Sequence, residues 1–379
     1  MNAFEFIMPG KIVFGAGKFN ENGALLSELG KKGLIVCDAW CNSTGLPAKL
    51  AEIMQTAGLE SVIYDGVIPN PTVELIDVGA KIAVDSACDF IIGLGGGSSM
   101  DTAKGIAVAA THEGSVWAYA MGEKDITTAT LPIAAISTTS GTGSQCTCFA
   151  VISNPETKQK PGMGSPYVLP QLAIVDPELM LSAPKQLTIN TGFDVFCHAV
   201  EAYTSTAASD LSDMYAEKAL MLVGQHMETC CEEGDNLEAR SGMALADTCA
   251  GIAICNGVVT LAHVMAHVIS GHFCDIPHGD ALYSIYSETL KFNSQALAEK
   301  HKFIANAIDP GNDDVVSAFE NFFGKFEFNN KLKEKFQENP DVVNIIAGDT
   351  FTYMKGIAEL NPVAANEEDA RNILSASLK

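Results

Sequence analysis

Four histidines stand close together in one stretch of the chain. The segment LAHVMAHVISGHFCDIPHGD contains His263, His267, His272 and His278, which are half of the eight histidines present. His263 and His267 are four residues apart in an apolar run, so on a helix they lie on one face, one turn apart. His278 stands in a Pro-His-Gly turn, from which its side chain can point back toward that face. Imidazoles arranged in this way can bind a divalent metal.

A second pair of possible ligands occurs upstream. In TGFDVFCHAVEAY, Asp194 and His198 have the same four-residue spacing on another apolar segment. Two helices that each present such a pair can close a metal site between them. One pair alone is more often a surface feature or a hydrogen-bonded core group. The metal hypothesis therefore depends on both pairs and the nearby third histidine occurring together in a chain that is poor in histidine.

A glycine-rich loop indicates a second kind of site. The apolar run from Phe90 to Gly93 leads into three consecutive glycines and two serines, and then into a helix that carries Asp101 and Lys104. Free backbone N–H groups at such a loop, together with the helix N-terminus, can hold a pyrophosphate. The loop matches neither the GxGxxG fingerprint nor a Walker loop, so the hypothesis rests on its strand, loop and helix order alone.

Polar residues also follow two neighbouring apolar runs. The strand predicted in KKGLIVCD ends at Asp38, where an acid can accept hydrogen bonds from a ribose diol and repel a ribose 2′-phosphate. The alternative is that Asp38 only caps the helix after it. The strand predicted in LPIAAIST leads into TSGTGSQCT, which offers hydroxyl groups and glycines. All of these segments would fall at the carboxyl ends of parallel strands, where such sheets bind ligands.

The predicted secondary structure differs between the first and second halves of the chain. Strands and helices alternate up to about Val175, which predicts a mainly parallel, helix-flanked, Rossmann-like sheet. From about Leu181 onward the pattern is helical, with helices expected near 185–204, 210–232, 235–254, 258–271 and 280–292. We therefore expect an α/β dinucleotide-binding domain over residues 1–180. Residues 181–379 should form an all-helical domain that binds the metal and carries out catalysis.

Composition narrows the class of protein. Apolar residues make up 47% of the chain and charged residues 18%, which is typical of a globular protein. A net charge of −23 argues against nucleic acid or an anionic membrane as a partner. Eleven scattered cysteines predict no disulfide framework and therefore a reducing, cytoplasmic location. We find no signal peptide and no apolar run long enough to span a membrane.

Taken together and in this order, the motifs resemble those of the iron-containing (group III) alcohol dehydrogenase family. GGGSSMDTAK resembles the cofactor loop of that family, and STTSGTGSQCT resembles its nicotinamide-side segment. NPT at 70–72 and VDPEL at 175–179 resemble its flanking signatures. TGFDVFCHAVEAY and HVMAHVISGHFCDIPHG resemble its two metal-binding helices. The similarity runs through most of the chain and implies the architecture of the dehydroquinate synthase-like proteins.

The resemblance also implies roles for individual residues. Asp194, His198, His263 and His278 would bind the metal, and His267 would lie beside the substrate without binding the metal. A dinucleotide would lie near a larger set of residues: Gly95, Gly96, Gly97, Ser98, Asp101, Thr138, Thr139, Thr142, Phe149 and Lys160. The chain departs from the family at Gln145, where Glu is common. It also has one additional residue between His267 and His278, and an extra His272 that could compete with His278.

We expect a metal-dependent, NAD-linked alcohol dehydrogenase or aldehyde reductase that acts on small uncharged alcohols. NAD is expected over NADP because of Asp38, although NADP stays possible. The metal would be Fe²⁺ or Zn²⁺, acting as a Lewis acid on the substrate oxygen during hydride transfer. Arginine occurs only at 240 and 371, and Lys218 and Arg240 are the only lysine or arginine between Gln186 and Leu290, which disfavours a phosphorylated substrate.

Three alternatives stay open at this stage. The first is a glycerol or diol dehydrogenase of the same superfamily. The second is a lyase similar to dehydroquinate synthase. The third is a non-catalytic nucleotide-binding protein with a structural metal. Relatives in the family are commonly oligomeric, so we expect a homodimer or a larger homo-oligomer.

Overall fold

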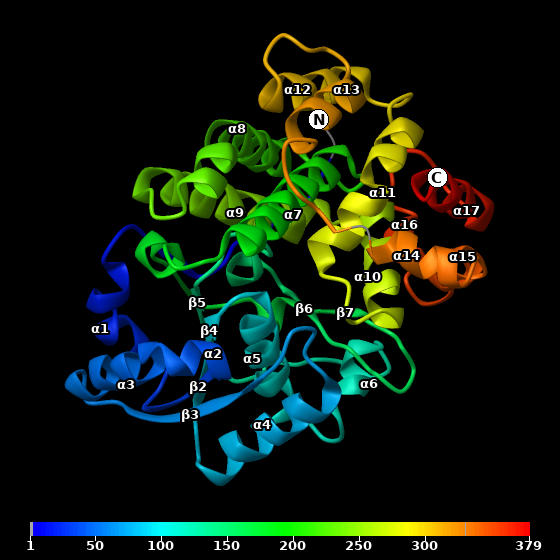
Figure 1. Ribbon diagram of the computed structural model, residues 1–379. Helices are drawn as coiled ribbons and strands as arrows, with labels where there is room; N and C mark the ends of the chain where they lie inside the picture. Colours follow the sequence, from blue (N-terminus) through cyan, green and yellow to red (C-terminus); the bar gives the residue numbers. More distant parts are fainter. Residues whose placement is uncertain (1–2, 330) are drawn as a thin grey trace. The chain divides into compact units, whose positions relative to one another are not determined.

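The computed structural model describes residues 3–329 and 331–379 (Figure 1). The chain divides into two compact units. Residues 7–182 form the first, which we call the sheet unit. Ala183–Lys379, together with residues 3–6, form the second, which we call the helical unit.

Parallel strands build the core of the sheet unit. Within the described residues, a six-stranded sheet has the order β1-β8-β5-β4-β2-β3, and all of its neighbouring strands are parallel. A separate antiparallel pair joins β6 to β7. The strands are β1 (Lys11–Phe14), β2 (Lys32–Asp38), β3 (Glu60–Val67), β4 (Phe90–Gly95), β5 (Ile133–Ser137), β6 (Phe149–Val151), β7 (Gly162–Gly164) and β8 (Leu172–Val175). Their continuous apolar runs are typical of strands that are covered on both faces.

Helices cover both faces of this sheet. Along β2, Leu34 and Val36 pack into one buried cluster, and Ile35 and Cys37 pack into another, because successive side chains point to opposite faces. The first cluster contains residues of α4 and α5, and the second contains residues of α3. The helices and 3-10 turns of this unit are η1 (Lys18–Glu21), α1 (Gly23–Leu26), α2 (Ala39–Ser43), α3 (Leu46–Thr56), α4 (Val73–Asp85), α5 (Gly97–Ala109), α6 (Val116–Ala120), η2 (Ser144–Cys146), η3 (Pro166–Val168) and η4 (Pro177–Met180).

The helical unit packs around one central helix. Its elements are α7 (Lys185–Thr204), α8 (Asp210–Glu232), α9 (Leu237–Gly257), α10 (Leu261–His272), α11 (His278–Asn293), α12 (Ala298–Ile308), α13 (Val315–Phe323), α14 (Lys331–Glu338), α15 (Val342–Tyr353), α16 (Lys355–Ala358) and α17 (Glu367–Ser377). Phe193 and Phe196 of α7 are buried against the rings of Tyr286, Phe319 and Phe323. This aromatic core fixes the position of α7, which also carries polar side chains.

The predicted fold class is confirmed: a parallel, helix-flanked sheet is followed by a helical region. All eleven cysteines are free thiols. Among the described residues, no single helix is long and apolar enough to cross a membrane. Helices α9 and α10, which meet at a bend of 101°, reach the necessary length and apolar composition only as a pair.

Candidate cofactor and metal sites

Three of the predicted polar segments meet at one edge of the sheet. Strands β2, β4 and β5 are consecutive neighbours, and they end at Asp38, Gly95 and Ser137. Gly95 is the register partner of Ser137. A Cβ built on Gly95 would lie 4.0 Å from Oδ2 of Asp38. The carboxyl ends of parallel strands therefore bring together the acid, the glycine loop and the threonine-rich segment.

The glycine loop leaves backbone exposed where side chains would not fit. Gly95 has φ 147°, a left-handed value that L-residues rarely adopt, and a Cβ there would lie 2.5 Å from Oγ of Ser99. A Cβ on Gly97 would lie 2.4 Å from Cγ2 of Thr142. Helix α5 begins at Gly97, and Gly96 before it provides no side-chain cap. No side chain thus caps the N–H groups of Gly97 and Ser98 at the start of this 13-residue helix, and they can bind an anion, while the Ser99 N–H donates to the Gly96 carbonyl at 3.0 Å.

A second predicted threonine, Thr139, also lies against this loop. A Cβ on Gly96 would come within 3.2 Å of Oγ1 of Thr139, whose carbonyl accepts a hydrogen bond from Oγ of Ser137 at 2.6 Å. Asp38 caps the neighbouring helix, because its Oδ1 accepts from the Cys41 N–H at 2.8 Å. The capping interpretation of Asp38 therefore holds for one of its two carboxylate oxygens.

Asp101 and Lys104 form an internal brace on α5. Oδ1 of Asp101 accepts from Ser144 Oγ at 2.7 Å, and Oδ2 accepts from the Val151 N–H at 2.9 Å. Burial raises the pKa of Asp101, and the Lys104 ammonium and these donors offset part of that rise. Lys104 is completely buried, and its Nζ contacts oxygens of Ser144, Thr147 and Phe149.

Several of the predicted cofactor-binding residues near Asp101 and Lys104 already form hydrogen bonds within the protein. Both oxygens of Asp101 are already used within the protein, and the carbonyl of Phe149 accepts from Lys104 Nζ at 2.6 Å. Nζ of Lys160 donates to Oδ1 of Asn70 at 2.8 Å and is largely buried. Asp101 therefore holds the segment after β5 in place.

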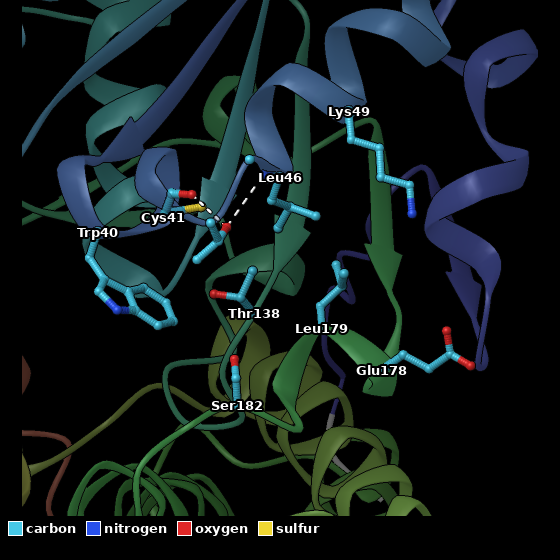
Figure 2. Close-up of a pocket in the computed structure, with 10 residues that line it drawn as sticks. Trp40, Cys41, Leu46, Lys49, Thr138, Glu178, Leu179 and Ser182 are labelled. Atoms are coloured by element: carbon cyan, nitrogen blue, oxygen red, sulfur yellow. Dashed lines mark hydrogen bonds between the residues drawn. The ribbon is translucent and has the colours of Figure 1, made fainter.

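A pocket of about 260 Å³ opens beside these strand ends (Figure 2). Its wall combines apolar side chains with hydroxyl groups. Figure 2 shows the indole of Trp40 on one side and Lys49 on the other, with Thr138 and Leu179 between them. The lining residues are Trp40, Cys41, Thr44, Gly45, Leu46, Lys49, Thr138, Glu178, Leu179 and Ser182. Trp40 and Cys41 directly follow the strand end that carries Asp38, so the pocket adjoins the acid.

The four predicted metal ligands come together in the helical unit. Oδ1 of Asp194 lies 3.2 Å from Nε2 of His263, 3.6 Å from Nε2 of His278 and 3.7 Å from Nε2 of His198. Asp194, His263 and His278 each offer one ligand atom to a group in which all such atoms lie within 4.8 Å. The rings of His198 and His263 are stacked, with centroids 4.5 Å apart. Three of these side chains are buried, and His278 is 24% exposed.

This donor set fits a divalent transition metal. Ligands placed at about 2.0–2.2 Å around a tetrahedral ion lie roughly 3.3–3.6 Å from one another, close to the distances measured from Asp194 Oδ1. One carboxylate and three imidazoles form a set of intermediate softness that suits both iron and zinc. The four side chains project from α7, α10 and the start of α11, which are anchored by their apolar faces.

The two remaining histidines of the segment have different surroundings. His267 is buried, and its ring centroid lies 5.2 Å from that of His278 and 6.2 Å from that of His263. His272, at the end of α10, forms an ion pair with Asp349, with Nε2 and Oδ2 2.7 Å apart. It is not in the group of ligand atoms around Asp194. The geometry therefore favours His278 over His272 as the fourth ligand.

Sequence reasoning missed one buried acid beside this cluster, Glu201. Its Oε1 accepts from Nδ1 of His263 at 2.6 Å. Burial alone would raise the pKa of Glu201, but His263 and Thr260 lower it below its usual range. Burial disfavours the charged form of His263, but Glu201 and Asp194 outweigh that effect and raise its pKa to about 9. The signal was present in HAVEAY, where Glu201 stands seven residues after Asp194 and so on the same helix face.

Comparison with known proteins places the chain in a family. Residues 9–177 match the family model described as iron-containing alcohol dehydrogenase. Residues 188–378 match the model for the C-terminal part of the Fe-containing alcohol dehydrogenase family.

Individual relatives match over most of their length. The NAD-dependent methanol dehydrogenase of Bacillus methanolicus is 32% identical over 383 residues, covering 98% of this chain and 99% of the relative. The 1,3-propanediol dehydrogenase of Klebsiella pneumoniae is 38% identical over 305 residues, covering 80% and 78%. Among solved structures, the archaeal halo-thermophilic Red Sea brine pool alcohol dehydrogenase ADH/D1 has a TM-score of 0.92 at 36% identity, covering 99% of each chain. The chain therefore belongs to the iron-containing alcohol dehydrogenase family and is an oxidoreductase that acts on alcohols.

Proposed function

We propose that this protein is an NAD-linked, metal-dependent dehydrogenase that interconverts small uncharged alcohols and their aldehydes. The observation that carries the proposal is the arrangement of three imidazole Nε2 atoms around Oδ1 of Asp194, at 3.2–3.7 Å. Asp194, His198, His263 and His278 would hold one divalent ion, Fe²⁺ or Zn²⁺. Affinity alone would favour zinc over iron.

The dinucleotide would bind at the strand ends of the sheet unit. The free N–H groups at the start of α5 suit its pyrophosphate, and Thr139 and Thr142 lie against the same loop. The pocket lined by Trp40 and Leu179 combines apolar and hydroxyl surface, which suits an adenine base. The second carboxylate oxygen of Asp38 would accept from the ribose diol and repel a 2′-phosphate.

The substrate would be small and uncharged. Between Gln186 and Leu290, Arg240 is the only arginine, and its guanidinium donates to Gly234 O, Thr188 Oγ1 and Ala183 O. These hydrogen bonds use the guanidinium within the fold, so it is not available to a substrate phosphate or carboxylate.

When bound, the metal supplies a Lewis acid for the substrate oxygen, and NAD supplies the hydride acceptor. His267 is the residue that we propose for proton transfer. Its imidazole lies one helical turn from His263 and next to His278, so it can take up the hydroxyl proton in oxidation and return it in reduction. His263 and His267 are buried, so these two rings are largely shielded from bulk water.

The test is turnover by metal-free protein reconstituted separately with Fe(II), under anaerobic conditions, and with Zn(II). NADH oxidation would be measured with short aldehydes, glyceraldehyde and dihydroxyacetone, and NAD reduction with methanol and 1,3-propanediol. Glyceraldehyde 3-phosphate is the charged counterpart of glyceraldehyde. We expect metal-dependent turnover of at least one uncharged aldehyde class and none of the phosphorylated substrate. The absence of turnover with both metals, despite measurable NADH binding, would contradict the proposal.

Cofactor preference has a separate test in Asp38→Ser. Serine keeps the helix cap and removes the charge, so the variant isolates repulsion of the 2′-phosphate from the loss of α2. We expect discrimination against NADPH to fall by about tenfold or more. Unchanged discrimination would remove Asp38 from cofactor selection.

A further inference from the structure

The buried carboxylate of Glu201 accepts four hydrogen bonds. It lies on α7, seven residues after Asp194 and three after His198, and it is only 3% exposed. Oε1 accepts from Nδ1 of His263 at 2.6 Å. Oε2 accepts from Thr260 N at 2.6 Å, from Thr260 Oγ1 at 3.0 Å and from His263 N at 3.3 Å. A single carboxylate thus receives four donors, all of them at the beginning of α10.

Two of these contacts cap a helix from outside it. Thr260 is the N-cap of α10, but its own side chain makes no capping hydrogen bond to the helix. The N–H groups in the first turn of a helix lack partners within the helix and carry partial positive charge. Oε2 of Glu201 satisfies the N–H groups of Thr260 and His263, so a residue of α7 determines where α10 begins. His263 lies in that first turn.

The fourth contact fixes the chemistry of His263. Its imidazole lies between two acids of α7, with Nδ1 facing Glu201 at 2.6 Å and Nε2 facing Asp194 at 3.2 Å. The ring is stacked on His198, with an angle of 16° between the ring planes. A neutral imidazole that donates through Nδ1 has its lone pair on Nε2, which is the form that can bind a metal at that atom.

From these contacts we infer that Glu201 is the positioning residue of the metal centre. Its two oxygens have separate tasks: Oε2 sets the start of α10, and Oε1 sets the tautomer and orientation of His263. The inference rests on the proposed metal site, because it assigns Glu201 no contact with metal, cofactor or substrate.

The variant Glu201→Gln distinguishes the role of the carboxylate as a hydrogen-bond acceptor from a role in packing alone. Glu201→Gln has nearly the same shape, but it offers one acceptor oxygen and one NH₂ group. If the amide oxygen faces the start of α10, the NH₂ group faces Nδ1 of His263 and requires the tautomer that is protonated on Nε2. If the amide is reversed, the donors of Thr260 face an NH₂ group. Neither orientation serves all four donors.

The experiment measures the dissociation constant of Zn²⁺ for metal-free protein by competition with a chromophoric chelator. For Glu201→Gln we expect affinity for zinc to fall about 10- to 100-fold, with NADH affinity unchanged and turnover recovered at saturating zinc. The matched control is Glu217→Gln. Glu217 is a partly buried acid that accepts from the Tyr203 hydroxyl at 2.8 Å, and its replacement should leave zinc affinity unchanged.

A second variant tests the division between the two oxygens. Thr260→Val removes only the Oγ1 donor, so it should lower thermal stability slightly while zinc affinity stays within threefold of wild type. In zinc-loaded wild type labelled with ¹⁵N-histidine, His263 should show a protonated Nδ1 and a metal-bound Nε2. This measurement remains informative if Glu201→Gln fails to fold.

Zinc affinity of Glu201→Gln within threefold of wild type would overturn the inference, as would a His263 bound to zinc through Nδ1. A different result is expected if the proposed metal site itself is incorrect. In that case Asp194→Ala would also bind zinc as tightly as wild type.

Discussion

Lys104 is a buried side chain whose removal should destabilise the sheet unit. It is 0% exposed, and Nζ lies 2.6–3.1 Å from five oxygens of Ser144, Thr147 and Phe149. An ammonium has three hydrogens, so about three of these contacts are full hydrogen bonds, each contributing roughly 1.5–3 kcal/mol. We consider Lys104→Met, which keeps the length and removes the charge.

The expected loss is smaller than the sum of those bonds, because the variant also avoids the cost of burying an ammonium. Breaking a buried charge arrangement by removing one partner costs about 3–5 kcal/mol, and Asp101 would be left without its neighbouring cation. At roughly 2–4 °C per kcal/mol for a unit of this size, the melting temperature should fall by about 10 °C. NADH affinity should also fall, because residues 144–149 lose their anchor.

The assay is differential scanning calorimetry together with hydrogen exchange of the amides between 141 and 151. Lys81→Met is the matched control, since Lys81 is exposed and forms a surface ion pair with Asp85, and it should change the melting temperature by less than about 2 °C. Asp101→Asn combined with Lys104→Met should recover part of the loss, because the uncompensated charge is gone. A melting temperature for Lys104→Met within 2 °C of wild type would refute this account of the brace.

Three further predictions concern single residues. Trp40 is 58% exposed and lines the proposed adenine pocket, so quenching of tryptophan fluorescence by bound NADH should fall more in Trp40→Phe than in Trp117→Phe. Burial lowers the pKa of His301, so the unfolded chain binds the extra proton and stability should decrease as pH falls below about 6.5. Between pH 7.5 and pH 5, the free energy of unfolding measured by chemical denaturation should decrease less in His301→Leu than in wild type. An equal decrease would show that His301 does not cause the loss of stability. Because His272 pairs with Asp349, His272→Asn should keep zinc affinity within threefold, and a tenfold loss would make His272 a ligand after all.

The sequence predicted those parts of the structure that depend on local pattern. Runs such as Phe90–Gly95 can only be buried strands or short buried helices, and the glycines after them favour a strand followed by a loop. The bounds of α7, Lys185–Thr204, agree with the predicted 185–204 because Pro184 ends the preceding segment and apolar spacing continues for 20 residues. The spacing of Asp194 and His198 then places both side chains on one face.

Other features depend on contacts that no local pattern reveals. The pair β6 and β7 consists of three-residue strands, and β7 reads Gly-Met-Gly, which carries little strand propensity. Nothing in the local sequence around Asp101 reveals its contacts with Ser144 and Val151, which lie 43 and 50 residues away. Glu201 looks like an ordinary helix acid until α10 supplies its donors. These residues take their roles from tertiary structure.

The central claim is that one metal, held through Asp194, is required for turnover. The most direct measurement is metal content and NADH-dependent aldehyde reduction for wild type and Asp194→Ala, each stripped with a chelator and then supplied with Fe(II) or Zn(II). We predict that stripped wild type is inactive but still folded and able to bind NADH, that metal restores its activity, and that Asp194→Ala neither retains metal nor recovers activity. Full turnover after chelation, or one tightly bound metal per chain in active Asp194→Ala, would contradict the account.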